Sequence, residues 1–313
     1  DLGTTYHGVL ERLVREIIEQ RADWNTIRGV DYEERIHQLS EDVARTLRGE
    51  ILLSSARSEY VLRRIETTLR RIVDSQFTRI QRGRFRPWRT ELAFGIGPGR
   101  ESLPPLKLTT PAGNTVLLRG KIDRVDIAED QNAFLVVDYK LRGTKLDPKR
   151  VYYGLSLQLL TYLLVLESHS ELLRTDKRLT PAGAIYVPLT RGTESVPHPS
   201  REPAEDRPRG AIERGSFESI DSAAKPYRAD LWTAEELAEL LAFARSRIVE
   251  VADQIISGRI EIAPYRSGTQ TPCGNCAYRS VCRFDTAHFR YNWLKPVTRS
   301  DLVAGAAKGD DDE

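Results

Sequence analysis

The stretch GKIDRVDIAEDQNAFLVVDYK, Gly120–Lys140, decides the fold of this chain. Its apolar run Phe134–Val137 is typical of a strand that is covered on both faces. A preceding strand is predicted through Val116–Leu118 and Ile122. The polar residues Glu129–Asn132 lie between the two apolar segments and predict the turn of an antiparallel β-hairpin.

Two acids and a lysine converge on this hairpin. Folding it about Asp130 and Gln131 places Asp123 opposite Asp138, and opposed residues of an antiparallel pair have Cβ atoms about 5 Å apart. Lys140 follows Asp138 by two residues, so its side chain points to the same face of the strand. The hairpin therefore carries two carboxylates and an ammonium group on one side.

Two interpretations of this cluster follow. Two carboxylates at that distance repel each other, and a hard divalent cation such as Mg²⁺ would offset the repulsion. Lys140 would then orient a water or stabilise charge on phosphorus. The alternative is structural, an ion pair between Lys140 and one aspartate with the other aspartate at the solvent edge. Spacing alone leaves both interpretations open.

The composition indicates a soluble globular protein of one large or two small domains. The chain has 313 residues, of which 40% are hydrophobic and 29% charged, without an apolar run of transmembrane length or a signal peptide. Its net charge of +2 does not by itself indicate a nucleic-acid partner. Because the chain begins at Asp1 and holds no Met, we expect a piece of a longer polypeptide.

The charge distribution is more informative than the total. Residues 62–100 contain ten arginines against three acidic residues, with Phe85 and Trp88 among them. Arginine suits phosphate recognition, so this segment predicts contacts with DNA. The residues that we expect to make these contacts are Arg79, Arg82, Arg84 and Arg86. The alternative is a solvated helix face.

Apolar periodicity and turn residues divide the chain into a helical part (1–86), an α/β core (87–190), a flexible excursion without chemistry (191–228), a segment with a helix and three cysteines (229–295) and an acidic tail (296–313). Helices are expected at 2–20, 32–47, 59–80 and 151–168, and strands at 88–95 and 183–189. Thr233 and Glu236 predict a capping box for a further helix, which Gly258 ends.

Four further polar residues are candidates for a role at the acids or in the core: His7, Glu91, Gln158 and Tyr162. His7 flanks the apolar stripe of the first helix, where a lone histidine is usually a satisfied core residue. Glu91 lies in the first strand, where it either faces the site or, as we expect, lies at the surface. Gln158 precedes Tyr162 by four residues and is expected on the same face of an apolar helix. A buried glutamine needs partners, which predicts a hydrogen bond from Gln158 to the sheet.

Cys273, Cys276 and Cys282 are spaced Cys-x2-Cys-x5-Cys. Three close thiolates argue against a disulfide framework and for a metal in a reducing, cytoplasmic compartment. Soft ligands suit zinc or an iron–sulfur cluster. His288 would complete a zinc site, whereas a four-cysteine cluster lacks its fourth ligand in this chain. On spacing alone the two remain open.

These motifs together resemble the PD-(D/E)xK nuclease superfamily, and within it the RecB-like nuclease domain of AddB/RexB-type subunits of bacterial helicase–nucleases. The resemblance rests on Asp123, on Asp138-Tyr139-Lys140, on Gln158 and Tyr162, on the Leu2-Gly3-x-x-x-His7 helix and on the cysteines. It implies an α/β fold in which helices flank a mixed central sheet, with an iron–sulfur staple near the C-terminus.

The resemblance also implies a mechanism. His7, Asp123, Asp138 and the Tyr139 carbonyl would hold Mg²⁺ or Mn²⁺, and Lys140 would position or activate the attacking water. Gln158 and Tyr162 would brace the site or the strand.

Cofactor, partner and substrate follow from the same resemblance. Cys273, Cys276 and Cys282 would bind a 4Fe–4S cluster whose fourth cysteine lies outside this chain, which favours iron–sulfur over zinc. The implied activity is that of an exonuclease on single-stranded DNA that an AddA-type helicase subunit delivers. The implied process is double-strand-break repair in a bacterial cytoplasm, with no membrane contact. The alternatives are a stand-alone CRISPR-associated nuclease with the same acids and cysteines, and a catalytically silent module that binds DNA ends.

Overall fold

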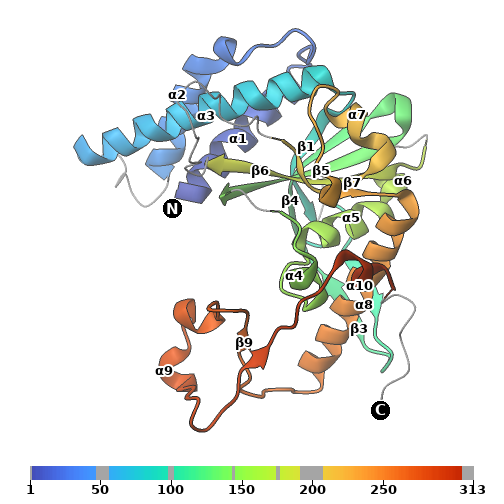
Figure 1. Ribbon diagram of the computed structural model, residues 1–313. Helices are drawn as coiled ribbons and strands as arrows, with labels where there is room; N and C mark the ends of the chain where they lie inside the picture. The colour runs from blue at the N-terminus through green and yellow to red at the C-terminus, as the bar shows by residue number, and fades with distance from the viewer. Residues whose placement is uncertain are drawn as a thin grey trace. The chain divides into compact units, whose positions relative to one another are not determined.

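A mixed six-stranded sheet organises the first of two units (Figure 1). The computed structural model describes residues 2–46, 56–97, 102–142, 145–173, 177–190 and 207–304. The first unit comprises residues 1–106, 117–146 and 158–237, and the second comprises 107–116, 147–157 and 238–313. No described helix combines the length and the apolar character needed to cross a membrane.

The sheet has the strand order β1-β4-β5-β6-β7-β8. Neighbours pair antiparallel, except that β5–β6 and β7–β8 are parallel, which confirms the expected mixed sheet. The strands are β1 (Arg86–Phe94), β4 (Gly120–Ala128), β5 (Ala133–Arg142), β6 (Thr180–Thr190), β7 (Arg209–Glu213) and β8 (Leu231–Trp232).

The predicted hairpin is formed by β4 and β5. Its pairs run from Ala128↔Ala133 to Arg124↔Val137, the register that places Asp123 opposite Asp138. The turn is a short 3-10 helix, and Asn132 after it has a φ of 49°, a left-handed conformation that asparagine tolerates. One part of the prediction is wrong: residues 116–118 do not begin β4 but lie in β3 (Thr115–Leu118), which pairs with β2 (Leu106–Thr109).

Alternation along β5 assigns the two faces of the sheet. Leu135, Val137 and Tyr139 belong to the core cluster that three helices cover, and these helices are α1 (Leu2–Glu19), α2 (Glu33–Thr46) and α3 (Ala56–Arg82). The even-numbered residues of β5 face the other way, toward α5 (Gln158–Ser168). Phe134 and Val136 are fully buried there, so β5 is covered on both faces as its apolar run predicts.

Two expectations about connecting segments are wrong. The helix predicted at 151–168 is broken into α4 (Pro148–Tyr152) and α5, because Gly154 takes a φ of 71° between them. Within the excursion predicted at 191–228, the described residues 207–228 include β7 and α7 (Phe217–Ile220). Residues 191–206, Leu47 and the tail beyond residue 304 lie outside the described part of the chain.

The capping box is present at the start of α8 (Ala234–Ile256). Thr233 N donates to Glu236 Oε2 at 2.8 Å, and Glu236 N donates to Thr233 Oγ1 at 3.2 Å. Gly258 follows the helix with a φ of 75°. The remaining elements are α6 (Ser170–Leu173), β9 (Tyr265–Arg266), α9 (Arg279–Cys282), β10 (Asn292–Trp293) and α10 (Arg299–Ala304).

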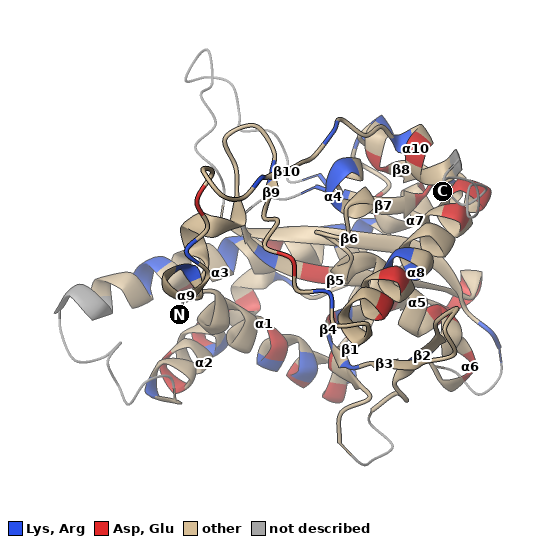
Figure 2. Cartoon of the chain, turned by 90° about the horizontal axis from the view of Figure 1, so that it is seen from below, with Lys and Arg blue, Asp and Glu red and all other residues tan. Residues whose placement is uncertain are grey.

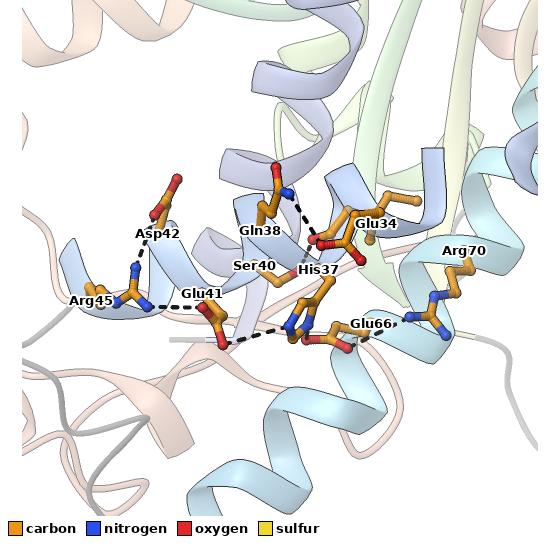
Figure 3. A network of polar contacts seen from close by, with 10 residues as sticks. Glu34, His37, Gln38, Ser40, Glu41, Asp42, Arg45, Glu66 and Arg70 are labelled. Atoms are coloured by element: carbon orange, nitrogen blue, oxygen red, sulfur yellow. Dashed lines mark hydrogen bonds and ion pairs between the residues drawn. The ribbon is translucent and has the colours of Figure 1, made fainter. Parts of the chain in front are cut away.

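A polar network joins α2 to α3 (Figure 3). Glu66 of α3 is buried, and its carboxylate lies 3.0 Å from His37 Nδ1 and 3.9 Å from Arg70 Nη2. The second ring nitrogen of His37 lies 3.6 Å from Glu41. The hydrogen bond to Glu66, which outweighs the effect of burial, raises the pKa of His37. The protonated ring therefore stabilises the contact between these helices.

This network makes a pH-dependent contribution to stability. Because the folded state raises the pKa of His37, the contribution is complete below the unfolded histidine pKa, about 6.5, and is lost as the pH rises through the folded value. We expect His37→Gln to lower the free energy of unfolding more at pH 5.5 than at pH 8.5. Urea unfolding of both proteins at the two pH values measures this. An equal loss at both would contradict a protonated His37.

Candidate metal centre

Three carboxylates occupy neighbouring positions on three adjacent strands. On β1, Thr90 pairs with Arg124 and Leu92 pairs with Ile122, which sets Glu91 opposite Asp123 of β4. The β4–β5 register in turn sets Asp123 opposite Asp138. The sheet order β1-β4-β5 therefore aligns Glu91, Asp123 and Asp138 across the strands.

Helix α1 adds an imidazole to this row. His7 Nδ1 lies 3.5 Å from Asp123 Oδ2, and its ring meets the Tyr139 ring edge-on at 5.9 Å. Ligand atoms of His7, Glu91 and Asp123 all lie within 4.8 Å of one another. Among the described residues this is the only such group of three metal-ligating side chains. His7 is thus brought to the acids rather than satisfied within the helical core.

Glu91 does not take the surface role expected of it. Its carboxylate is only partly exposed and lies 2.7 Å from Lys121 Nζ, while also reaching the group with His7 and Asp123. Its backbone has a φ of 50°, unusual for a residue within a strand. The pairing of β1 with β4 creates this position, and that pairing cannot be read from the sequence around Glu91.

The environment of the acids disfavours their charged forms. Burial, and next the charge of Asp138, raise the pKa of Asp123 to about 6, although the Tyr139 N–H donates to Asp123 Oδ2 at 2.8 Å. Burial also raises the pKa of Asp138, against the opposing effect of Lys140. A cation bound between the two carboxylates would remove this cost.

Lys140 and Gln158 complete the cluster. Lys140 Nζ lies 2.8 Å from Asp138 Oδ2 and donates to Gln158 Oε1 at 2.9 Å. Among the described residues, this ammonium is the partner of the buried Asp138 Oδ2, which has no second hydrogen-bond donor. Gln158 Nε2 donates to Tyr162 OH at 2.7 Å and to Asp138 Oδ1 at 3.4 Å. The predicted convergence of these residues is present.

Gln158 reaches the acids by a different route from the one expected. It is the first residue of α5 and is exposed, whereas the sequence places it within a buried stripe. The break before α5 frees its side chain to extend toward β5. Tyr162, one turn later, is buried, which raises its pKa to about 12, so its hydroxyl stays protonated.

The donor set suits a hard divalent cation. Carboxylate oxygens of Glu91 and Asp123 converge with the imidazole of His7, and Asp138 lies beside Asp123 on the next strand. The observed Lys140–Asp138 ion pair agrees with the structural alternative for Asp138, but it leaves the pKa of Asp123 raised. The Tyr139 carbonyl as a further ligand stays a prediction.

The four arginines expected to contact DNA separate into two kinds, although basic residues do line α3 (Figure 2). Arg82 and Arg84 are exposed. Arg79 is only 7% exposed, and Arg86 donates to the carbonyls of Ile80, Gly83 and Phe85. Burial keeps Arg79 off the outer surface, and these backbone bonds hold Arg86 against the chain. On the outer surface the prediction of phosphate contacts is therefore kept only for Arg82 and Arg84, whereas Arg79 borders a cavity described below.

The three cysteines are free thiols in the second unit, and Cys276 is exposed. A mononuclear zinc site would draw its ligand atoms to about 4 Å of one another. Neither the cysteines nor His288 form such a group within the described part of the chain.

Comparison with known proteins agrees with this arrangement. The model of the PD-(D/E)XK nuclease superfamily matches residues 1–283. The chain is 36% identical to the B subunit of the ATP-dependent helicase/deoxyribonuclease of Moorella thermoacetica, over 91% of this chain and 27% of that protein. For the proteins of the same name from Symbiobacterium thermophilum and Desulforudis audaxviator the identities are 34% and 32%, over 92% and 96% of this chain and 26% and 28% of the relatives.

This chain therefore spans about a quarter of the length of these relatives. The family model covers both the helix that carries His7 and the strands that carry Asp123, Asp138 and Lys140. With that match over most of its length, the chain belongs to the PD-(D/E)XK nuclease superfamily.

Proposed function

We propose that this chain is the nuclease domain of a bacterial helicase–nuclease subunit and that it hydrolyses phosphodiester bonds of single-stranded DNA as an exonuclease dependent on Mg²⁺ or Mn²⁺. The observation that carries the proposal is the alignment of Glu91, Asp123 and Asp138 beside Lys140. The names of the relatives, which combine helicase and deoxyribonuclease, support a role next to a helicase partner of the AddA type.

The side chains divide the work. His7, Glu91, Asp123 and Asp138, with the Tyr139 carbonyl, would hold the metal, which when bound supplies charge stabilisation at phosphorus and acidifies a water. The Tyr139 N–H fixes one oxygen of Asp123, so the other is left for a ligand. With a metal on Asp138, the Lys140 ammonium is free to hold the attacking water.

Gln158 sets the position of that ammonium. It accepts from Lys140 and donates to both Asp138 and Tyr162, so it ties the catalytic lysine to α5. The Lys140 ammonium can only donate, so it fixes the orientation of the Gln158 amide by requiring Oε1, and Nε2 then donates to the Tyr162 hydroxyl. Gln158 and Tyr162 are positioning residues rather than ligands.

A 4Fe–4S cluster on Cys273, Cys276 and Cys282 is the second part of the proposal, with a fourth cysteine supplied from outside this chain. The supporting observation is that no residue from Val251 to Ser300 is buried. A segment of that length without a hydrophobic core gains its order from a metal or from a partner. Three soft thiolates within this segment fit an iron–sulfur cluster.

The acids and the lysine can be tested by hydrolysis. We expect Asp138→Asn to lower cleavage of end-labelled single-stranded DNA in Mg²⁺ by about 100-fold or more, and Lys140→Ala by about 10²–10⁴-fold, the size of a lost general acid–base group. Asp130→Asn, an exposed acid in the hairpin turn, is the matched control and should cleave at the parental rate. Parental cleavage by Asp138→Asn, or cleavage that persists in EDTA, would sink the proposed site.

The metal can be tested by stability, without activity. The folded state raises the pKa of Asp123 to about 6, so the folded protein holds this proton more tightly than the unfolded chain does. The free energy of unfolding therefore falls as the pH rises from about 4 to about 6. In EDTA at pH 7.5 we expect Asp123→Asn to raise the free energy of unfolding by on the order of 1–3 kcal/mol, and at pH 4 to have little effect. Mn²⁺ should stabilise the parent but not the variant. Equal Mn²⁺ stabilisation of both proteins would contradict a metal on Asp123.

The cluster can be tested by colour and content. Iron bound to thiolates absorbs in the visible range, whereas Zn²⁺ is d¹⁰ and colourless. The longer parent protein, purified without oxygen, should be brown and contain iron and sulfide. Cys276→Ala should bleach it and leave Mn²⁺ binding at Asp123 unchanged. A colourless, zinc-containing parent protein would contradict the proposed iron–sulfur cluster and leave the proposed nuclease activity unaffected.

A further inference from the structure

A polar cavity, separate from the cluster of acids, lies in the first unit beside α3. It has a volume of about 200 Å³, larger than a single water requires. Helix α3 lines one side with Gln76, Arg79 and Arg82, and β6 contributes the stretch Tyr186–Pro188. Arg207 and Asp221 close it from the segments on either side of β7.

Arg79 is the unusual member of this lining. Its side chain is more than nine-tenths buried, yet it borders the cavity. It donates to Gln76 Oε1 at 2.7 Å, a neutral acceptor, and no carboxylate of the described residues lies within 4.0 Å of its guanidinium. Burial, and next the positive charge of Arg124, lower the pKa of Arg79 to about 10. A buried cation without an anionic partner is costly to the fold.

The carboxylate that could neutralise Arg79 is engaged elsewhere. Asp126, the acid with the largest electrostatic effect on Arg79, forms a bidentate pair with Arg124 at 2.7 and 2.9 Å. Arg124 also donates to Gln76 Oε1, the oxygen that accepts from Arg79. Two guanidinium groups therefore meet at Gln76, and Asp126 is paired with Arg124. The positive charge of Arg79 therefore has no carboxylate partner among the described residues of this network.

The rest of the cavity adds to that excess. Arg82 and Arg207 line it, and neither forms an ion pair among the described residues. Asp221 is the one acid of the lining, and its Oδ1 accepts from the backbone N–H groups of Ala223 and Ala224. Three guanidinium groups thus face one carboxylate that is already hydrogen-bonded.

We propose that this cavity is an anion-binding site that takes a phosphate group between Arg79, Arg82 and Arg207. Guanidinium groups bind phosphate by paired, charge-assisted hydrogen bonds, and a phosphate there would supply the negative partner that Arg79 lacks. The site is separate from the acids, because Gln76 and Arg124 lie on the α3 side of the sheet and Asp138 faces α5. It does not depend on the nuclease chemistry.

The position of the cavity links it to the strands of the metal centre. Tyr186, Val187 and Pro188 pair with Asp138, Tyr139 and Lys140, respectively. From Arg79 a hydrogen-bonded chain runs through Gln76 and Arg124 to the Tyr139 hydroxyl. A phosphate group in the cavity would thus contact β6, the neighbour of the strand that presents Asp138 and Lys140.

The test uses the full chain in EDTA, so that hydrolysis does not interfere. Inorganic phosphate, titrated against chloride of equal ionic strength, should raise the melting temperature in a saturable way, as expected for a ligand of the folded state. The double variant Arg82→Gln/Arg207→Gln alters only partly or fully exposed side chains and should weaken phosphate binding about tenfold or more. Arg63→Gln, an exposed arginine of α3 outside the cavity, is the control and should bind as the parent does.

Oligothymidylates with and without a 5′-phosphate identify the source of the group. Displacement of phosphate by the phosphorylated strand alone assigns a DNA end, displacement by both assigns the DNA backbone, and displacement by neither assigns a free anion. Each of these results supports the site. A phosphate effect no larger than that of chloride, or one that the double variant retains in full, overturns it, whatever the nuclease assays show.

Discussion

The antiparallel register of β4 and β5 is the constraint on which the rest of the structure depends. It places Asp123 opposite Asp138, and burial prevents water from screening the repulsion between them. The surrounding groups respond to this repulsion. The Tyr139 N–H, Lys140 and the imidazole of His7 all approach the two carboxylates, and each contact lowers the cost of their charge.

The same register creates a second polar layer beneath the sheet. Because Asp123 faces α5, its neighbour Arg124 faces α3, where a charge can be buried only with partners. Asp126, Tyr139 and Gln76 supply those partners within hydrogen-bond distance. Strand β4 therefore carries the candidate metal ligand Asp123 on one face and the ion pair of Arg124 with Asp126 on the other. Contacts of Asp123 and Arg124 with Tyr139 fix β4 relative to β5.

Local sequence was sufficient for the features that local rules control. The turn at residues 129–132 and the period of two set Asp123, Asp138 and Lys140 together, and the capping box at Thr233 and Glu236 is likewise a short-range pattern. The helix interruption at Gly154 was missed because apolar periodicity continues across it. A glycine in that stretch was the available signal.

Long-range pairing explains what the sequence did not provide. Glu91 joins the acids only because β1 pairs with β4, about thirty residues further along, and residues 209–213 form a strand by pairing with β6 on one side and β8 on the other. The burial of Arg79 depends in the same way on the packing of α3 against distant segments. A basic run in a helix predicts charge but not which of its members the tertiary structure covers.

The left-handed backbone of Glu91 has a consequence for the evolution of this domain. A glycine at that position would adopt a φ of 50° without strain, and the strand would gain on the order of 1 kcal/mol. The substitution would also delete a carboxylate from the row of acids. An unstrained backbone and a carboxylate therefore exclude each other at this residue, so a mutation that stabilises the fold by this route also removes the acid.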